Sequence, residues 1–270
     1  MQAPRGQHDA IGIFDSGVGG LTVFRRVTER LPRESIVYLG DTARVPYGTK
    51  SAETVIRYAR GCARILLERG IKMLVVACNT ASACALETLQ EELDVPVVGV
   101  IEPGAAAAVR ATRNKRIGVI GTAGTIHSDA YPQAMRSFNP DLQVFCKACP
   151  LFVPLVEEGW TEGTVALEAA RIYLAEMIER NVDTLVLGCT HYPLLRDVIA
   201  GVMGPEVTLV DSAQATAEVV SDVLNGISVS STEEGPPRRH FLVSDSPEAF
   251  ATIGRRFLGQ DIGNVEWVDF

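Results

Sequence analysis

Two cysteines stand in matching contexts in the two halves of the chain. Each comes after a short apolar run, residues 73–77 for Cys78 and residues 184–188 for Cys189, and each precedes polar residues. A thiolate is a base as well as a nucleophile, and the pKa of an ordinary cysteine is about 8.5. Two thiols that approach one cleft from opposite sides can remove a proton from one face of a carbon acid and return a proton to the other face. This pairing favours an enzyme that inverts a stereocentre.

The apolar runs before the two cysteines are typical of buried strands in a parallel sheet, because helices cover both faces of such a sheet. Each cysteine then falls at the carboxyl end of a strand, where open α/β sheets place their ligands. We also expect a helix to begin just after each cysteine. Its dipole would favour the thiolate and lower the pKa of the thiol.

The other cysteines have simpler interpretations. Cys62, Cys84 and Cys146 are expected to be small buried hydrophobic residues. Cys146 and Cys149 have C-x-x-C spacing, but a structural zinc site needs a second pair, and the sequence supplies none at a suitable place. We therefore expect no metal site, and we expect the thiols to stay reduced in the cytoplasm.

Strands and helices alternate along the chain, which is typical of a parallel sheet with right-handed crossovers. The predicted strands are 10–14, 35–39, the run before Cys78, 95–100, 116–121, the run before Cys189, 207–210 and 239–244. Predicted helices end near residues 31 and 93 and span 51–68 and 211–224. Residues 226–237 are rich in Ser, Glu, Gly and Pro, which is typical of an exposed loop. Ser246 and Pro247 are suitable as the N-cap and first residue of a last helix.

The pattern of the first half returns in the second half. The string 116–123 parallels 10–17, with an offset of 106 between Ser16 and Thr122, and the two cysteines are offset by 111. Similar offsets over two separate motifs indicate two copies of one unit. The predicted fold class is α/β: two similar doubly wound domains with mostly parallel sheets, and the active site in the cleft between them. The first domain would comprise residues 1–97 and 208–270, and the second residues 98–207.

The charge and hydropathy of the chain exclude some classes of binding partner. The 270 residues carry a formal net charge of −8, which argues against nucleic acid and anionic membranes as partners. No apolar run approaches the ~20 residues that span a bilayer. The first ten residues lack the apolar core of a signal peptide, so cytoplasmic location is expected.

Six strings, taken together and in order, resemble the glutamate racemases within the aspartate/glutamate racemase superfamily. The resemblance extends from Ile11 to about Asp211. The strings are residues 12–22, 38–48, 78–81, 99–104, 153–159 and 188–194.

The resemblance implies an isomerase that interconverts L- and D-glutamate without a cofactor or metal. It further implies a homodimer that supplies D-glutamate for peptidoglycan, and so for the cell wall and cell shape. Cys78 would be the base that acts on D-glutamate and Cys189 the base that acts on L-glutamate. Asp15 would assist Cys78 and His191 would assist Cys189, with Asp41 and Glu157 as further catalytic acidic residues. The implied substrate contacts are Asp15, Ser16, Pro46, Tyr47, Gly48, Asn79, Thr80, Thr122, Thr190 and His191.

Several alternatives remain open from the sequence. Asp15 is also suitable as an ordinary turn residue, and His191 as a helix cap. The glycines at 17–20 invite a nucleotide-binding interpretation, but they lack G-x-G-x-x-G spacing and no Walker lysine comes after them. A racemase acting on aspartate is the nearest enzymatic alternative. A silent binding protein of the same fold is a further one, although it would have no need of paired bases.

Overall fold

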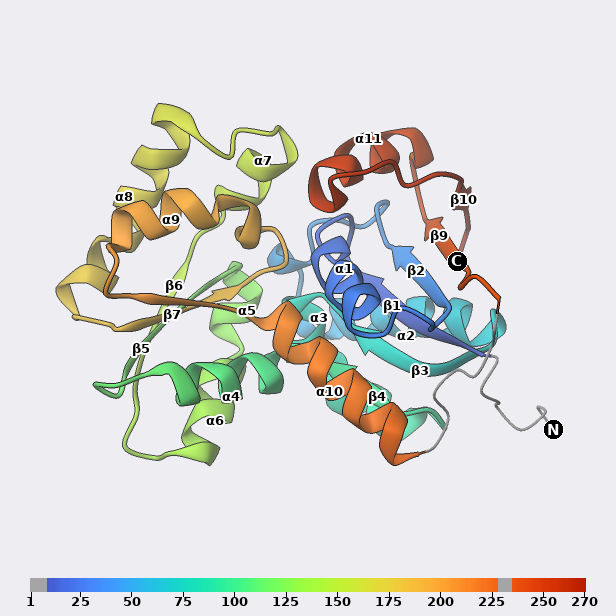
Figure 1. Ribbon diagram of the computed structural model, residues 1–270, viewed down its shortest axis with the longest axis horizontal. Coiled ribbons are helices and arrows are strands. Elements are labelled where there is room, and N and C mark those ends of the chain that lie inside the picture. Colours follow the sequence, from blue (N-terminus) through green and yellow to red (C-terminus); the bar gives the residue numbers. More distant parts are fainter. Residues whose placement is uncertain (1–8, 228–234) are drawn as a thin grey trace.

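The computed structural model describes residues 9–227 and 235–270, so part of the predicted loop at 226–237 lies outside the described residues. Two lobes lie side by side, each built on its own sheet with helices on both faces (Figure 1). All strand pairs in both sheets are parallel. The predicted fold class is confirmed.

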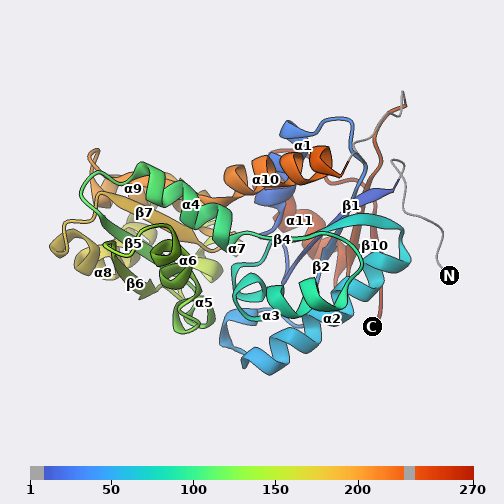
Figure 2. The same cartoon turned by 90° about the horizontal axis from the view of Figure 1, so that it is seen from below.

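The first sheet has six strands in the order β10-β9-β2-β1-β3-β4. These are β1 (Ala10–Asp15), β2 (Ile36–Gly40), β3 (Ile71–Val76), β4 (Val97–Gly99), β9 (Arg239–Val243) and β10 (Val265–Trp267). Helices α2 (Ala52–Glu68) and α3 (Asn79–Glu92) cover one face, and α1 (Leu21–Arg30), α10 (Ser212–Gly226) and α11 (Pro247–Leu258) lie on the other (Figure 2).

The second sheet has four strands in the order β6-β5-β7-β8. These are β5 (Arg116–Gly121), β6 (Gln143–Ala148), β7 (Thr184–Gly188) and β8 (Thr208–Asp211). Counted within each half, the order is second-first-third-fourth in both sheets, as two copies of one unit require. Helices α4 (Ile101–Ala111) and α6 (Ala130–Phe138) cover one face, and α7 (Phe152–Glu157), α8 (Gly163–Glu179) and α9 (Arg196–Met203) cover the other.

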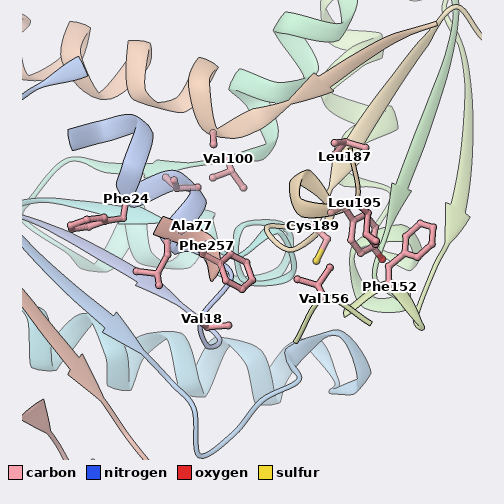
Figure 3. Packing of buried hydrophobic residues seen from close by; sticks show 14 of the residues in the cluster. Val18, Phe24, Ala77, Val100, Phe152, Val156, Leu187, Cys189, Leu195 and Phe257 are labelled. Atoms are coloured by element: carbon pink, nitrogen blue, oxygen red, sulfur yellow. The ribbon is translucent and has the colours of Figure 1, made fainter. Parts of the chain in front are cut away.

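Strand β3 shows how sequence alternation builds the layers. Successive side chains of a strand point to opposite faces of its sheet. Met73 and Val75 accordingly join the core cluster beneath α1, whereas Leu74 and Val76 join the cluster beneath α2 and α3. The first of these clusters continues into the other lobe and includes Cys189, so one apolar layer links the two halves (Figure 3).

The C-terminal segment returns to the first sheet, as predicted, because β9 pairs with β2. Ser246 is the N-cap residue of α11 and Pro247 is its first residue, both as predicted. Ser246 has φ 48° and its side chain makes no capping hydrogen bond.

The domain division at 97/98 and 207/208 stays a prediction. By pairing, β4 belongs to the first sheet and β8 to the second. Among the helices of residues 9–227 and 235–270, none has the length and hydropathy of a membrane-spanning segment.

Candidate active site

A small cavity lies where the carboxyl ends of the two sheets meet. Its volume, taken as the space that the centre of a water molecule can occupy, is about 30 Å³. Both Cys78 and Cys189 line it, and each is only 6% exposed. The two thiols predicted to share one cleft therefore do share one. The full lining is Ser16, Val45, Pro46, Tyr47, Gly48, Cys78, Asn79, Thr80, Thr122, Val153, Cys189, Thr190 and His191.

Cys78 is the N-cap residue of α3, as the sequence predicts. The turn that carries it is fixed by Ser82, whose hydroxyl donates to the carbonyl of Val76 and accepts from the Val100 N–H. The expected lowering of its pKa is wrong. Burial and the nearby Asp15 carboxylate raise the pKa of Cys78 to about 12, against the smaller effects of the Ala81 N–H and the Ser16 hydroxyl.

Asp15 ends β1 and lies behind the cavity wall, fully buried. One carboxylate oxygen accepts from the Gly17 N–H at 3.0 Å, and the other accepts from the Thr190 hydroxyl at 3.5 Å. Burial raises the pKa of Asp15 above its usual range, although the charge of His191 opposes the shift. The glycine turn lets the backbone pass close by, because a Cβ on Gly20 would lie 2.5 Å from the Cβ of Asp15.

Cys189 lies at the end of β7, as predicted, but the predicted helix does not begin directly after it. A 3₁₀ turn, η2 (Tyr192–Leu195), comes first, and α9 begins only at Arg196. A dipole acts over the first turn of a helix, so Cys189 does not gain from α9 what Cys78 gains from α3. The side chain that lies beside the Cys189 sulfur is that of His191.

His191 connects Cys189 to Glu157. Its Nδ1 lies 3.9 Å from the Cys189 sulfur, and its Nε2 lies 3.0 Å from Oε1 of Glu157 at the end of α7. Burial alone would lower the pKa of His191, but its hydrogen bonds to these two groups raise it to about 10. The ring therefore holds a second proton at neutral pH and donates in both directions. It caps no helix with its side chain.

Asp41 lies outside the cavity lining and organises the loop after β2. Its carboxylate accepts from the hydroxyls of Tyr47 at 2.6 Å and Ser244 at 2.7 Å, and it pairs with Arg44 at 2.8 Å. Both oxygens are thus engaged by protein groups. Through the hydrogen bond that it accepts from the Tyr47 hydroxyl, Asp41 fixes the position of this tyrosine in the cavity lining.

Polar groups of the two lobes meet around the cavity. The Thr80 hydroxyl lies 2.9 Å from that of Thr122, and the Tyr131 hydroxyl donates to Oδ1 of Asn79 at 2.8 Å. The Nδ2 of Asn79 is buried and has no hydrogen-bond partner among the described residues. Such a donor needs an acceptor, because an unpaired buried polar group costs about 1–3 kcal/mol.

The structure brings together nearly all the residues predicted from the sequence. Of the ten predicted substrate contacts, all but Asp15 line the cavity, while Asp15, Glu157 and Asp41 contact residues that do. Val45 and Val153 also line the cavity, and neither is predicted from the sequence. Both belong to the strings that carry the family resemblance, but an aliphatic side chain gives no chemical reason to single it out.

Comparison with known proteins identifies the family. The model of the Asp/Glu/Hydantoin racemase family matches residues 11–220. A glutamate racemase from Geobacter metallireducens is 58% identical over 95% of each chain. The chain belongs to the glutamate racemase family. This confirms the resemblance seen in the sequence, and the protein is an isomerase that acts on a small molecule.

Solved glutamate racemases share the whole fold. An isoform from Bacillus anthracis is 41% identical over 98% of each chain, with a TM-score of 0.94. The glutamate racemase from Francisella tularensis, solved in complex with D-glutamate, is 36% identical, covers 97% of this chain and 98% of its own, and has a TM-score of 0.92.

Proposed function

We propose that this glutamate racemase interconverts L- and D-glutamate by a two-base reaction in which Cys78 and Cys189 are the bases, without a cofactor. The observation that carries the proposal is that both thiols line one buried cavity. Each sits just beyond the third strand of its own unit. The solved relative that holds D-glutamate supports glutamate as the substrate.

In the proposed reaction one cysteine is a thiolate and the other a thiol. With D-glutamate, the Cys78 thiolate takes the Cα proton, and the Cys189 thiol gives its proton to the opposite face of the carbanion. The enzyme is left with a Cys78 thiol and a Cys189 thiolate, which is the form that accepts L-glutamate. No electron is gained or lost, so the chemistry needs no redox partner.

The two sides of the cavity support this exchange with different groups. His191 holds a proton beside the Cys189 sulfur and can stabilise it as an anion. Burial, and after it the neighbouring Asp15 carboxylate, raise the pKa of Cys78 and so hold the proton on the thiol. A substrate ammonium group placed beside Asp15 would offset this repulsion, so binding of the amino acid itself would ready Cys78 as a base.

The substrate carboxylates need fixed donors, because negative charge grows on the α-carboxylate as the proton leaves. The unpaired Nδ2 of Asn79 supplies one. The hydroxyls of Ser16, Thr80 and Thr190 line the same wall and can rotate toward a bound substrate, which would take the Thr190 hydrogen bond from Asp15. Backbone N–H groups at the start of α3 add to them.

The proposal extends to the setting of the enzyme. We propose that it works in the cytoplasm as a homodimer, and that its D-glutamate enters peptidoglycan and so supports the cell wall and cell shape. Size-exclusion chromatography with light scattering measures the oligomeric state directly.

Incubation with glutamate in D2O tests the reaction. The protein alone, extensively dialysed against a chelator, should place deuterium at Cα while it racemises the substrate, and aspartate in a parallel reaction should be far slower. Cys78→Ser and Cys189→Ser should each abolish racemisation, whereas Cys84→Ser, which alters a thiol outside the cavity, should not. Racemisation that persists in either active-site variant would disprove the two-base mechanism, and a requirement for an added cofactor would disprove cofactor independence.

A further inference from the structure

Helix α11 belongs to the first lobe, yet its last turn reaches the second. The helix is pressed onto α1, because a Cβ on Gly254 would lie 2.9 Å from Leu21. Arg25 of α1 donates to the carbonyl of Phe257 at 3.4 Å. Its position is therefore set by its own lobe. Figure 1 places this end of α11 next to α7 of the other lobe.

Phe257 meets the imidazole of His191 at this junction. The two ring centroids are 5.4 Å apart and the ring planes are nearly perpendicular, at 88°. Phe257 is 1% exposed and His191 is 3% exposed, so the two rings shield each other from water. Figure 3 shows Phe257 on the side of the first lobe, near Val156 and Cys189 of the second.

Arg256, the residue before Phe257, contacts Glu157, which is the hydrogen-bond partner of His191. Its guanidinium donates to the backbone carbonyl of Glu157, and it also packs where a side chain on Gly159 would otherwise lie. Glu157, whose carboxylate holds His191, is thus contacted through its backbone by one residue of α11, and the next residue of the same helix contacts the His191 ring. That helix lies outside the repeated unit.

We infer that Phe257 is a positioning residue for the reaction: it holds the His191 ring in line between Cys189 and Glu157 and keeps water from it. The inference rests on the proposed role of His191. The charged or titratable groups around the ring are Cys189, Glu157 and Asp15, and Arg256 lies behind Glu157. Without Phe257, water enters and the ring turns away from the sulfur.

The test compares Phe257→Ala, Phe257→Leu and Ile253→Ala in the full-length enzyme. Ile253 is on the same helix and packs on the same core cluster, but its aliphatic side chain offers His191 neither an aromatic ring nor a hydrogen bond. We expect Phe257→Ala to lower kcat about 10- to 100-fold with KM changed less than about threefold, because misplaced catalytic groups mainly cost turnover. Phe257→Leu, which still excludes water, should recover most of the loss.

A titration of labelled histidine by NMR separates positioning from simple destabilisation. The His191 signal is assigned by its absence in His191→Asn. In Phe257→Ala the midpoint should move away from about 10, because water relieves the burial that lowers the pKa of His191 and weakens the two hydrogen bonds that raise it. Ile253→Ala should leave it unmoved.

The outcomes distinguish the inference from the function on which it rests. Normal kcat and an unmoved His191 titration in Phe257→Ala, with His191→Asn inactive, would overturn the inference alone. Equal effects in Ile253→Ala would also overturn it. Full activity of His191→Asn would instead overturn the proposed role of His191.

Discussion

The hydroxyls of Thr80 and Thr122 lie 2.9 Å apart across the boundary between the two lobes. Thr80 is in the first turn of α3, close behind Cys78, and Thr122 is the N-cap of α5 (Ala123–His127). Both side chains also lie within 3.1 Å of the Thr125 hydroxyl. One cluster of three hydroxyls therefore joins the cavity wall of one lobe to that of the other.

Thr122→Ala should weaken both the cluster and α5. The Thr122 hydroxyl accepts from the Thr125 N–H, and loss of an N-cap costs about 1 kcal/mol. We expect KM for glutamate to rise about 5- to 10-fold, since roughly that factor corresponds to one hydrogen bond. Thr122→Ser keeps the hydroxyl and is the control. Steady-state kinetics with urea unfolding measures both effects, and unchanged KM would mean that this cluster does not shape the substrate site.

Gly19→Ala should disable the enzyme without unfolding it. A Cβ on Gly19 would lie 2.3 Å from the Thr190 hydroxyl and 2.5 Å from Nδ1 of His191, so it would push both away from Cys189. We expect kcat to fall at least about 10-fold.

Gly201→Ala is the matched control for that substitution. Gly201 lies within α9 and a Cβ there would meet nothing within 4 Å. It should leave kcat unchanged and raise the free energy of unfolding by about 0.5–1 kcal/mol, as expected for Gly to Ala in an exposed helix. Wild-type kcat in Gly19→Ala would show that the ring of His191 tolerates displacement.

The stability contributed by His191 should depend on pH. Its pKa is about 10 in the folded protein, against 6.5 without partners, so between these values the native state holds a proton that the unfolded state has lost. The contribution is complete below pH 6.5 and declines with rising pH, by at most about 1.4 kcal/mol per pH unit, until it is lost through pH 10.

Urea unfolding of the wild type and His191→Asn at pH 6.5 and 8.0 measures this decline. The difference in the free energy of unfolding between the two proteins should shrink by about 1.6 kcal/mol over that interval. Shifts that both proteins share, such as the raised pKa of Cys78, cancel in the difference. Parallel curves for the two proteins would mean that His191 is neutral in the native state.

Asp41→Asn should act on Tyr47 and on stability, not on proton transfer. The change leaves Arg44 without its carboxylate and weakens the bond to the Tyr47 hydroxyl. We expect a loss of about 1–3 kcal/mol in stability and a raised KM. Tyr47→Phe should raise KM as well, and the double variant should show less than the sum of the two effects, because they share one contact. A pH–rate profile that changed shape in Asp41→Asn would instead make Asp41 part of the proton chemistry.

The sequence predicts the strand ends and the residues on them well. Cys78, Cys189 and the polar residues after them are local features of a strand-to-turn pattern, and a repeated pattern brings two such ends together. The helix predicted directly after Cys189 is wrong, because Pro193 and its neighbours form a 3₁₀ turn first. The predicted direction of the Cys78 pKa shift is also wrong, since the depth of burial decides it and is not written in the local sequence.

Contacts over long sequence separations are beyond the reach of the sequence patterns. Phe257 and His191 are 66 positions apart and lie in different lobes, and nothing in the spacing of aromatic residues indicates their contact. Asp41 is predicted as a catalytic acid on the strength of its string alone. Only the three-dimensional structure shows that Tyr47, Arg44 and Ser244 occupy its oxygens.

The shared strand order of the two sheets has a consequence for the ligands themselves. L- and D-glutamate are mirror images, and an enzyme that acts on both must present comparable reactive groups to each enantiomer. A chain of L-amino acids cannot form one unit and its mirror image. Two copies of the same unit that face each other instead place a strand end with a cysteine on each side of the cavity. Asp15 and His191 break that likeness, so in the proposed reaction each enantiomer would meet its own proton donor and its own electrostatic surroundings.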